Sequence, residues 1–260
     1  MSVEQTRYLK KIRKQKIIIT GIQLLLTIII FTIWEILSRR EIINSFIYSS
    51  PTKIIKTINE LIITNNFFTH IWCTLKEVLF AFALGSTMGL FIAIILYEFP
   101  IIAKILEPFL VTINSLPKVA LGPLIIIIAG ANFKSVIIMA LLINLIITIM
   151  NLYNGFINVD NNKLILLRSL NASKMQILKY LILPGSLNII ISSLKINVSM
   201  TLIGVIMGEF LVSKQGVGYL IIYGTQIFNM NLVMSGILML IVMSVAIYLV
   251  VSYLEKKHQK

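Results

Sequence analysis

Long apolar runs separated by short polar segments dominate the chain. The runs cover residues 17–38, 72–97, 105–130, 135–154, 186–212 and 231–254. A helix of about 20 residues, rising about 1.5 Å per residue, crosses the roughly 30 Å hydrocarbon layer of a bilayer. The pattern therefore predicts an all-α polytopic membrane protein with about six transmembrane helices.

The first run follows a basic N-terminal segment, residues 1–16, which is also how a signal peptide begins. A signal peptide has an apolar region of only about 7–15 residues, followed by small residues at a cleavage site. This run is longer and ends in Trp34-Glu35, shortly before Arg39-Arg40. We therefore expect residues 17–38 to remain as a first transmembrane helix.

Residues 39–71 form a mixed, polar stretch that we expect outside the cell. Within it, the segment Thr52–Thr64 has apolar residues at positions 54, 55, 58, 61 and 62. This spacing places them on one side of a helix, and Pro51 suits the first helical turn. The stretch therefore predicts an interfacial helix that lies on the outer membrane surface.

The third run is interrupted by Pro108, Pro117 and Pro123. Proline lacks a backbone donor and disrupts the helix around it. Broken backbone at membrane depth persists only where protein or a water-filled cavity satisfies it. Two interpretations stay open here: a kinked helix, or an element that lines a translocation pathway, with Pro117, Leu121 and Pro123 as its candidate residues.

Composition supports a membrane protein. Hydrophobic residues make up 58% of the chain and charged residues 13%, and the mean hydropathy is +0.94. Ordinary globular domains are about half apolar and about a quarter charged, so a water-soluble globule and a disordered chain are both excluded. The single Cys73 and the distant His70 and His258 suggest no disulfide and no metal site.

The net charge of +13 indicates orientation rather than nucleic-acid binding. Lys and Arg concentrate in the cytoplasmic segments of membrane proteins, where they also attract anionic lipid headgroups. Six crossings with a cytoplasmic N-terminus place fourteen basic residues inside and six outside. We therefore expect both termini, including the tail 255–260, in the cytoplasm, with membrane lipid rather than nucleic acid as the partner.

The loop 155–184 carries the most specific local signals. Leu164–Leu170 predicts a short helix, and Asn171 suits the left-handed residue that ends one. Ser173 and Gln176 have the spacing of a capping box that starts a second helix. An apolar face is expected on this second helix, made of Met175, Ile177, Leu178 and Leu181, and Pro184 is expected in the first turn of the next membrane helix. The hairpin is either a plain connector or an element that docks into a groove on a soluble partner.

The run LLRSLNASKMQILKYLILP resembles the cytoplasmic coupling loop of ABC-importer permeases. The segments YSSPTKI, TLKEVLFAFALGSTMGL, INSLPKVALGPLIIIIAG and LIGVIMGEFLVSKQGVGYLI are similar to binding-protein-dependent permeases of the nitrate, sulfonate, taurine and pyrimidine-precursor type. The resemblance extends from about residue 49 to 254. It departs from the family at Ile165, Leu166 and Leu167, which replace Glu-Ala-Ala, and at Asn171, which replaces glycine.

This resemblance implies the type I ABC importer permease fold, with a permease core at 72–254 that includes the coupling loop. It implies a homodimer, two cytoplasmic ATPase subunits that bind ATP and Mg, and an extracytoplasmic substrate-binding protein. It implies no cofactor on this chain. The ATPase-coupling residues would be Leu166, Leu167, Arg168, Ser169, Leu170, Asn171, Ala172, Ser173 and Gln176.

Three further residues are candidates with two interpretations each. A carboxylate in a membrane helix is energetically costly unless it is paired or hydrated. Glu209 is therefore either part of the translocation pathway or a structural hydrogen-bonding group between helices. Gly216 and Gly218 resemble the family's external loop. They either contact the binding protein or serve a turn that requires glycine.

Two other classes of function compete with the permease. A secondary transporter driven by an ion gradient requires an internal repeat or midplane carboxylates, and neither is evident. A membrane enzyme requires convergent His, Asp or Glu residues. The chain also has no G-x-x-x-x-G-K-[ST] motif, so we expect ATP hydrolysis on a separate chain. Within the permease class, the solute is expected to be small, and either anionic or heterocyclic.

Overall fold

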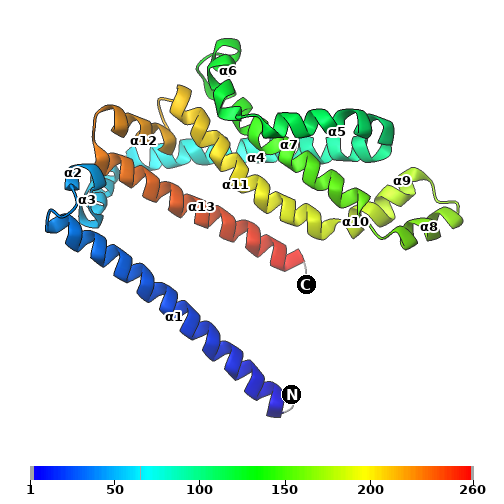
Figure 1. Cartoon of the computed structure of the whole chain (residues 1–260), viewed down its shortest axis with the longest axis horizontal. Coiled ribbons are helices and arrows are strands. Elements are labelled where there is room, and N and C mark those ends of the chain that lie inside the picture. The colour runs from blue at the N-terminus through cyan, green and yellow to red at the C-terminus, as the bar shows by residue number, and fades with distance from the viewer. Residues whose placement is uncertain (1–2, 65, 259–260) are drawn as a thin grey trace.

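A computed structural model describes residues 3–64 and 66–258, nearly all of them helical, with no strand among them (Figure 1). Residues 1–2, 65 and 259–260 lie outside this description. They include the ends of the predicted N-terminal segment 1–16 and of the tail 255–260. The predicted all-α fold class is confirmed.

Within the part of the chain that the structure describes, five helices are long and apolar enough to cross a membrane. They are α1 (Val3–Arg39, apolar from Ile17), α4 (Asn66–Glu98), α7 (Phe133–Ile157), α11 (Leu187–Val212) and α13 (Met230–His258). Four of these helices contain the whole run predicted from the sequence, and α11 lacks only the first residue of the run 186–212. Helix α1 begins fourteen residues before its run, because the basic N-terminal residues continue the same helix.

The third predicted crossing is broken rather than merely kinked. It consists of α5 (Pro100–Ser115), the 3₁₀ turn η1 (Lys118–Leu121) and α6 (Gly122–Ala129), and the two halves meet at 87°. Leu116 is extended, with φ −65° and ψ 142°, which is the conformation that a following proline imposes. Pro117 therefore ends α5 and permits the bend.

The core forms where α4, α7 and α11 pack together, and Val78, Ala81, Ala140 and Val205 are fully buried there. The small residues Gly85 and Gly89 let α4 approach α7 closely. A Cβ added at Gly85 would lie 2.4 Å from Asn144 Oδ1. Small residues four positions apart on a membrane helix permit this close packing.

Short helices gather at the two ends of this core (Figure 1). At one end lie α2 (Ser45–Tyr48), α3 (Pro51–Ile63) and α12 (Val217–Gln226). The helix predicted at 52–64 is confirmed as α3, with Ser50 as its N-cap and Pro51 in its first turn. The buried Ile54 lies on α3, which packs against α13 and α4.

At the opposite end the chain forms α8 (Asn161–Ser169), α9 (Lys174–Ile177), the π-helical turn η2 (Leu178–Ile182) and α10 (Leu183–Gly185) (Figure 1). Pro184 was expected in the first turn of the membrane helix. It lies instead in α10, because Ser186 interrupts the helix before α11 begins at Leu187. The Ser186 hydroxyl donates to the carbonyl of Gly155, which fixes this break against α7.

Candidate functional site: a surface hairpin and a broken span

The turn between α8 and α9 has the backbone that the sequence predicts. Asn171 has φ 56°, in the left-handed region. Its amide donates to Arg168 O at 2.9 Å, and the amide of Ala172 donates to Leu167 O at 3.0 Å. These two bonds are those of a Schellman motif, which satisfies the last carbonyls of a helix. Asn171 therefore supplies the left-handed residue at the position where the family that the loop resembles has glycine.

Both helices of the hairpin have side-chain caps. Asp160 accepts from the amide of Asn162 at 2.9 Å and starts α8 three residues before the predicted Leu164. In α9, the amide of Ser173 donates to Gln176 Oε1 at 2.7 Å, and the amide of Gln176 donates to Ser173 Oγ at 3.3 Å. The predicted capping box is confirmed, so the hairpin is a defined structure rather than a loose connector.

The hairpin has an inner and an outer face. On the inner face, Leu164, Leu167 and Ala172 pack against a buried cluster around Phe156, with Ile177 inside it. The outer face exposes apolar side chains that no described residue covers: Ile165, Leu166, Leu170 and Met175. Met175 was expected on the packed face and is instead 67% exposed, because α9 turns it away from the cluster that Ile177, Leu178 and Leu181 join.

Of the nine predicted coupling residues, seven lie on the exposed surface of the hairpin: Leu166, Arg168, Ser169, Leu170, Asn171, Ser173 and Gln176. Leu167 and Ala172 are half-buried. A pocket of about 570 Å³ separates the hairpin from the end of α4 and the start of α5. Tyr97 and Glu98 line it on the α4 side, and Arg168 and Lys174 line it on the hairpin side.

The broken span places Pro117, Leu121 and Pro123 on one segment of η1 and α6. The two prolines are exposed and Leu121 is half-buried. The surrounding segment also exposes large apolar side chains, namely Leu116, Val119, Leu124, Ile127 and Ile128. The bend therefore presents an uncovered apolar surface.

Lys118 is a charged residue in this bend that the sequence analysis did not single out. Its side chain is 8% exposed, and its Nζ donates to Asn114 Oδ1 at 3.0 Å. No carboxylate among residues 3–64 and 66–258 forms a salt bridge with it. Ionisable residues inside membrane segments are costly and usually functional. The signal in the sequence was a lysine directly after the proline that breaks the span.

Glu209 is fully buried, with 0% exposure, and its carboxylate is held by donors from two other helices. Oε1 accepts from Thr74 Oγ1 at 2.6 Å, and Oε2 accepts from the Gly218 amide at 2.5 Å. This places the carboxylate at the N-terminus of α12, where free amides favour a negative charge. The hydrogen bonds of Glu209 go to α4 and α12 rather than to the broken span. The role of Glu209 in the translocation pathway stays a prediction.

Gly216 and Gly218 enclose this carboxylate. Gly216 has φ +115°, and a Cβ added there would lie 2.3 Å from Cδ of Glu209. At Gly218 an added Cβ would lie 2.7 Å from Glu209 Oε2. The geometry shows why a turn here requires glycine. Contact of these glycines with a binding protein stays a prediction.

The residues that bind this turn from α4 were also missed in the sequence. His70 Nδ1 accepts from the Gly216 amide at 3.0 Å, and Thr74 Oγ1 accepts from the Val217 amide at 2.8 Å. His70, Thr74 and Glu77 lie three or four positions apart, so they share one face of α4. That polar spacing within an apolar helix was the available signal.

An all-helical bundle with a broken apolar span and a capped helix–turn–helix at one end has the architecture expected of a membrane transport permease. Within that class, residues 85–260 match the family described as the binding-protein-dependent transport system inner membrane component. The chain belongs to this family. It is the membrane permease of an ABC transporter, and the alternatives of a secondary transporter and of an enzyme are set aside.

Individual relatives agree with this assignment. The chain is 27% identical over 234 residues to the putative aliphatic sulfonates transport permease protein SsuC of Bacillus subtilis, covering 90% of this chain and 85% of that protein. It is 27% identical over 192 residues to the formylaminopyrimidine transport permease protein ThiX of Halalkalibacterium halodurans, covering 74% of this chain and 76% of that protein.

The fold is similar to that of a solved importer. A chain of the inward-facing MetNI methionine ABC transporter superposes with a TM-score of 0.63 at 16% identity, covering 72% of this chain and 94% of that one. This similarity supports the predicted type I ABC importer permease fold.

Proposed function

We propose that two copies of this chain form the translocation pathway of an ATP-driven importer. Each α8–α9 hairpin docks on a cytoplasmic ATPase subunit, which binds and hydrolyses ATP with Mg. An extracytoplasmic binding protein delivers the solute to the opposite end. The ATPase favours one state of the pathway by binding that state more tightly than the other.

The observation that carries this proposal is the outer face of the hairpin. Leu170 is 69% exposed at the tip, next to the left-handed Asn171, and both flanking helices are capped. Exposed apolar residues on a rigid, polar-capped hairpin suit insertion into an apolar groove. Because Ile165, Leu166 and Leu167 stand where the family has Glu-Ala-Ala, the contact with this ATPase is more apolar than in the family pattern.

Uncovered apolar surface supports the second copy. No side chain is buried in the most apolar stretch of α1. In α5, Ala103 is the one buried residue among those described. The bend of η1 and α6 is likewise exposed around Pro117 and Pro123. A broken segment at membrane depth needs protein or a water-filled cavity around it. A pathway between two copies of the broken span provides both.

Lys118 favours an anionic solute. A buried ammonium with one neutral partner is stabilised by any anion that approaches it, because Coulomb attraction is stronger where water is excluded. Of the two relatives above, one is named for aliphatic sulfonates and the other for formylaminopyrimidine. The cation at the bend supports a sulfonate-like anion over a neutral heterocycle.

The orientation we propose places both termini and the hairpin in the cytoplasm, and α3 and α12 on the outer side. The positive-inside rule supports it, because this orientation places fourteen basic residues on the cytoplasmic side and six on the outer side.

Reconstitution tests the proposed function. Permease and ATPase are purified together and placed in proteoliposomes, with the binding protein supplied on one side and ethanesulfonate or taurine as the labelled solute. Uptake that requires ATP and stops when the ATPase is omitted supports the proposal. Uptake driven by a proton or sodium gradient without the ATPase would overturn it.

A further inference from the structure

Helix α1 leaves the body of the molecule at one end and diverges from α13 along the rest of its length (Figure 1). Its contacts with the body include α2 and α3, next to its C-terminal end. Ser38 is buried there, whereas residues 17–33 are exposed throughout. The direction of a 23-residue membrane helix therefore depends on a small joint near its last turn.

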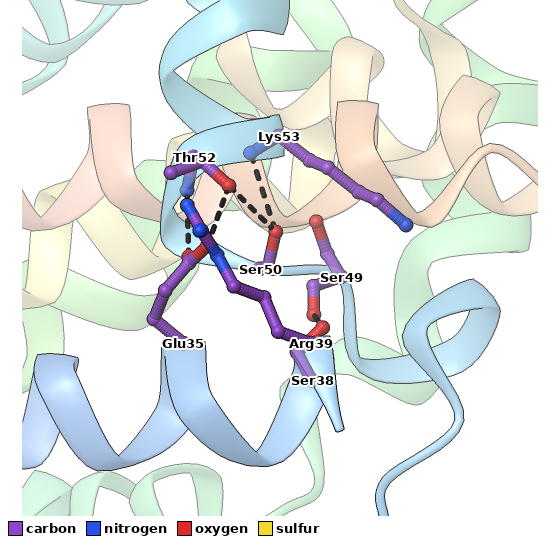
Figure 2. Close-up of polar contacts among 7 residues, drawn as sticks. All are labelled: Glu35, Ser38, Arg39, Ser49, Ser50, Thr52 and Lys53. Atoms are coloured by element: carbon purple, nitrogen blue, oxygen red, sulfur yellow. Dashed lines mark hydrogen bonds and ion pairs between the residues drawn. The ribbon is translucent and has the colours of Figure 1, made fainter. Parts of the chain in front are cut away.

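This joint is made of polar contacts between the last turn of α1 and the first turn of α3 (Figure 2). Glu35 Oε2 accepts from the Thr52 amide at 3.1 Å, and Glu35 Oε1 accepts from Thr52 Oγ1 at 2.8 Å. Ser38 Oγ donates to the Ser49 carbonyl at 3.0 Å. We refer to Glu35, Ser38, Ser49 and Thr52 together as the α1–α3 joint.

The chemistry of the joint suits a carboxylate. Thr52 is the second residue of α3, so its amide is one of the helix-terminal donors without an intrahelical partner. A negative charge at a helix N-terminus is favourable, and here it comes from another helix. Arg39 Nε donates to Glu35 Oε1 at 2.7 Å, which orients the carboxylate from the same side of α1.

The other side of the joint is fixed to the body. Ser49 Oγ donates to Asn231 Oδ1 on α13 at 2.7 Å. Ser235 on the same helix donates to the carbonyl of Ile54 at 3.4 Å, and Ile54 is buried. These bonds attach the start of α3 to α13, and the bonds to Glu35 connect α1 to the start of α3.

The geometry points to Glu35 as a positioning residue that sets the angle of α1 relative to the permease body. The 23-residue membrane segment of α1 spans about 35 Å. A change of about 10° at the joint would move the far end of the helix by about 6 Å. This inference rests on the proposed function only in that α1 packs against a second copy of the chain. Its test therefore measures the angle between α1 and the permease body, and not transport.

The test is a distance distribution between the free ends of α1 and α13 in lipid nanodiscs. Ile18→Cys and Val250→Cys are labelled with nitroxides in a Cys73→Ser background, diluted with unlabelled protein, and measured by double electron–electron resonance. Both positions are exposed. In the otherwise unchanged protein we expect one narrow distribution.

Glu35→Ala is expected to widen this distribution at least twofold. Thr52→Val removes the hydroxyl donor and keeps the amide. The width of its distance distribution should therefore lie between the widths for the unchanged protein and for Glu35→Ala. Glu35→Gln keeps an acceptor oxygen for Thr52 and should restore most of the narrowing. The matched control is Glu60→Ala, which removes an exposed carboxylate from the other end of α3 and should change nothing.

An unchanged width in both Glu35→Ala and Thr52→Val, or equal broadening in Glu60→Ala, would overturn the positioning role. If Glu35→Ala does not fold, Thr52→Val and Glu35→Gln decide the question. The proposed function fails separately, through the absence of ATP-dependent uptake by the unmodified chain.

Discussion

At the scale of single residues, the buried Glu209 determines how the turn before α12 is built. Its carboxylate accepts from Thr74 and from the Gly218 amide, and it leaves no room for a side chain at residue 218. Gly218 is therefore required by packing even though its backbone is not in the left-handed region.

Gly218→Ala should destabilise the permease. The added Cβ would lie 2.7 Å from Glu209 Oε2 and 2.9 Å from Glu209 Cβ, and overpacking of a close-packed site costs about 1–3 kcal/mol. We expect a thermal unfolding midpoint several degrees lower in detergent. Gly21→Ala is the matched control, because nothing lies within 4 Å of a Cβ added there. Equal midpoints for the two variants would contradict the packing assigned to Glu209.

Lys118→Met tests the charge at the bend of the broken span. Removing the ammonium should lower ATP-dependent uptake of an anionic sulfonate about tenfold, which corresponds to about 1.4 kcal/mol of lost stabilisation. Assembly with the ATPase should not change. Lys104→Met, which removes an exposed lysine from α5, should leave uptake at the unmodified level. Full uptake by Lys118→Met would argue against an anion contact at the bend.

At the scale of elements, the hairpin was predicted closely because its signals are local. Asn171, Ser173 and Gln176 act on backbone groups within a few residues of themselves, so their spacing alone indicates the turn and the cap. The orientation of Met175 could not be predicted, because it depends on how α9 meets the buried cluster around Phe156.

The geometry of the broken span could likewise be predicted only in part from the sequence. Its prolines predict disruption, and the sequence left a kink and a pathway-lining break open. The 87° bend depends on contacts of η1 and α6 with α7 and α11. The contact with α11 joins residues far apart in the chain, and no local spacing encodes it. For the same reason the sequence offered hydrogen bonding between helices for Glu209 but did not identify its partners on α4 and α12.

Leu170→Asp should separate docking from folding. Leu170 is exposed at the tip of the hairpin and contributes nothing to the buried cluster, so a charge there should weaken ATPase binding without affecting membrane insertion. We expect loss of co-purification and of uptake. Asn162→Asp adds the same charge at the exposed start of α8 and should bind the ATPase normally.

Ala172→Asp is a harsher variant of the same test. Ala172 is half-buried against the cluster around Phe156, so its charge should also loosen the hairpin. Normal assembly and uptake in both Leu170→Asp and Ala172→Asp would contradict the docking role.

At the scale of the whole molecule, the permease is a helical bundle with three exposed surfaces to which we assign partners. The hairpin lies at one end, and the turn around Gly216 and α3 lie at the other (Figure 1). The exposed broken span lies on one side of the bundle, and α1 extends away from the bundle on the opposite side. Apolar runs, charge bias and the family resemblance together were enough to predict this layout. The splayed direction of α1 was not predictable, because it follows from the bonds between Glu35 and Thr52.

The central claim is that the hairpin faces the cytoplasm, where an ATPase acts on it. Single cysteines at Lys174 on the hairpin and at Ile63 on α3, each in a Cys73→Ser background, are exposed in intact cells to an impermeant maleimide. We predict labelling at position 63 at once and at position 174 only after the membrane is permeabilised. Labelling at 174 in intact cells, with 63 protected, would contradict the account.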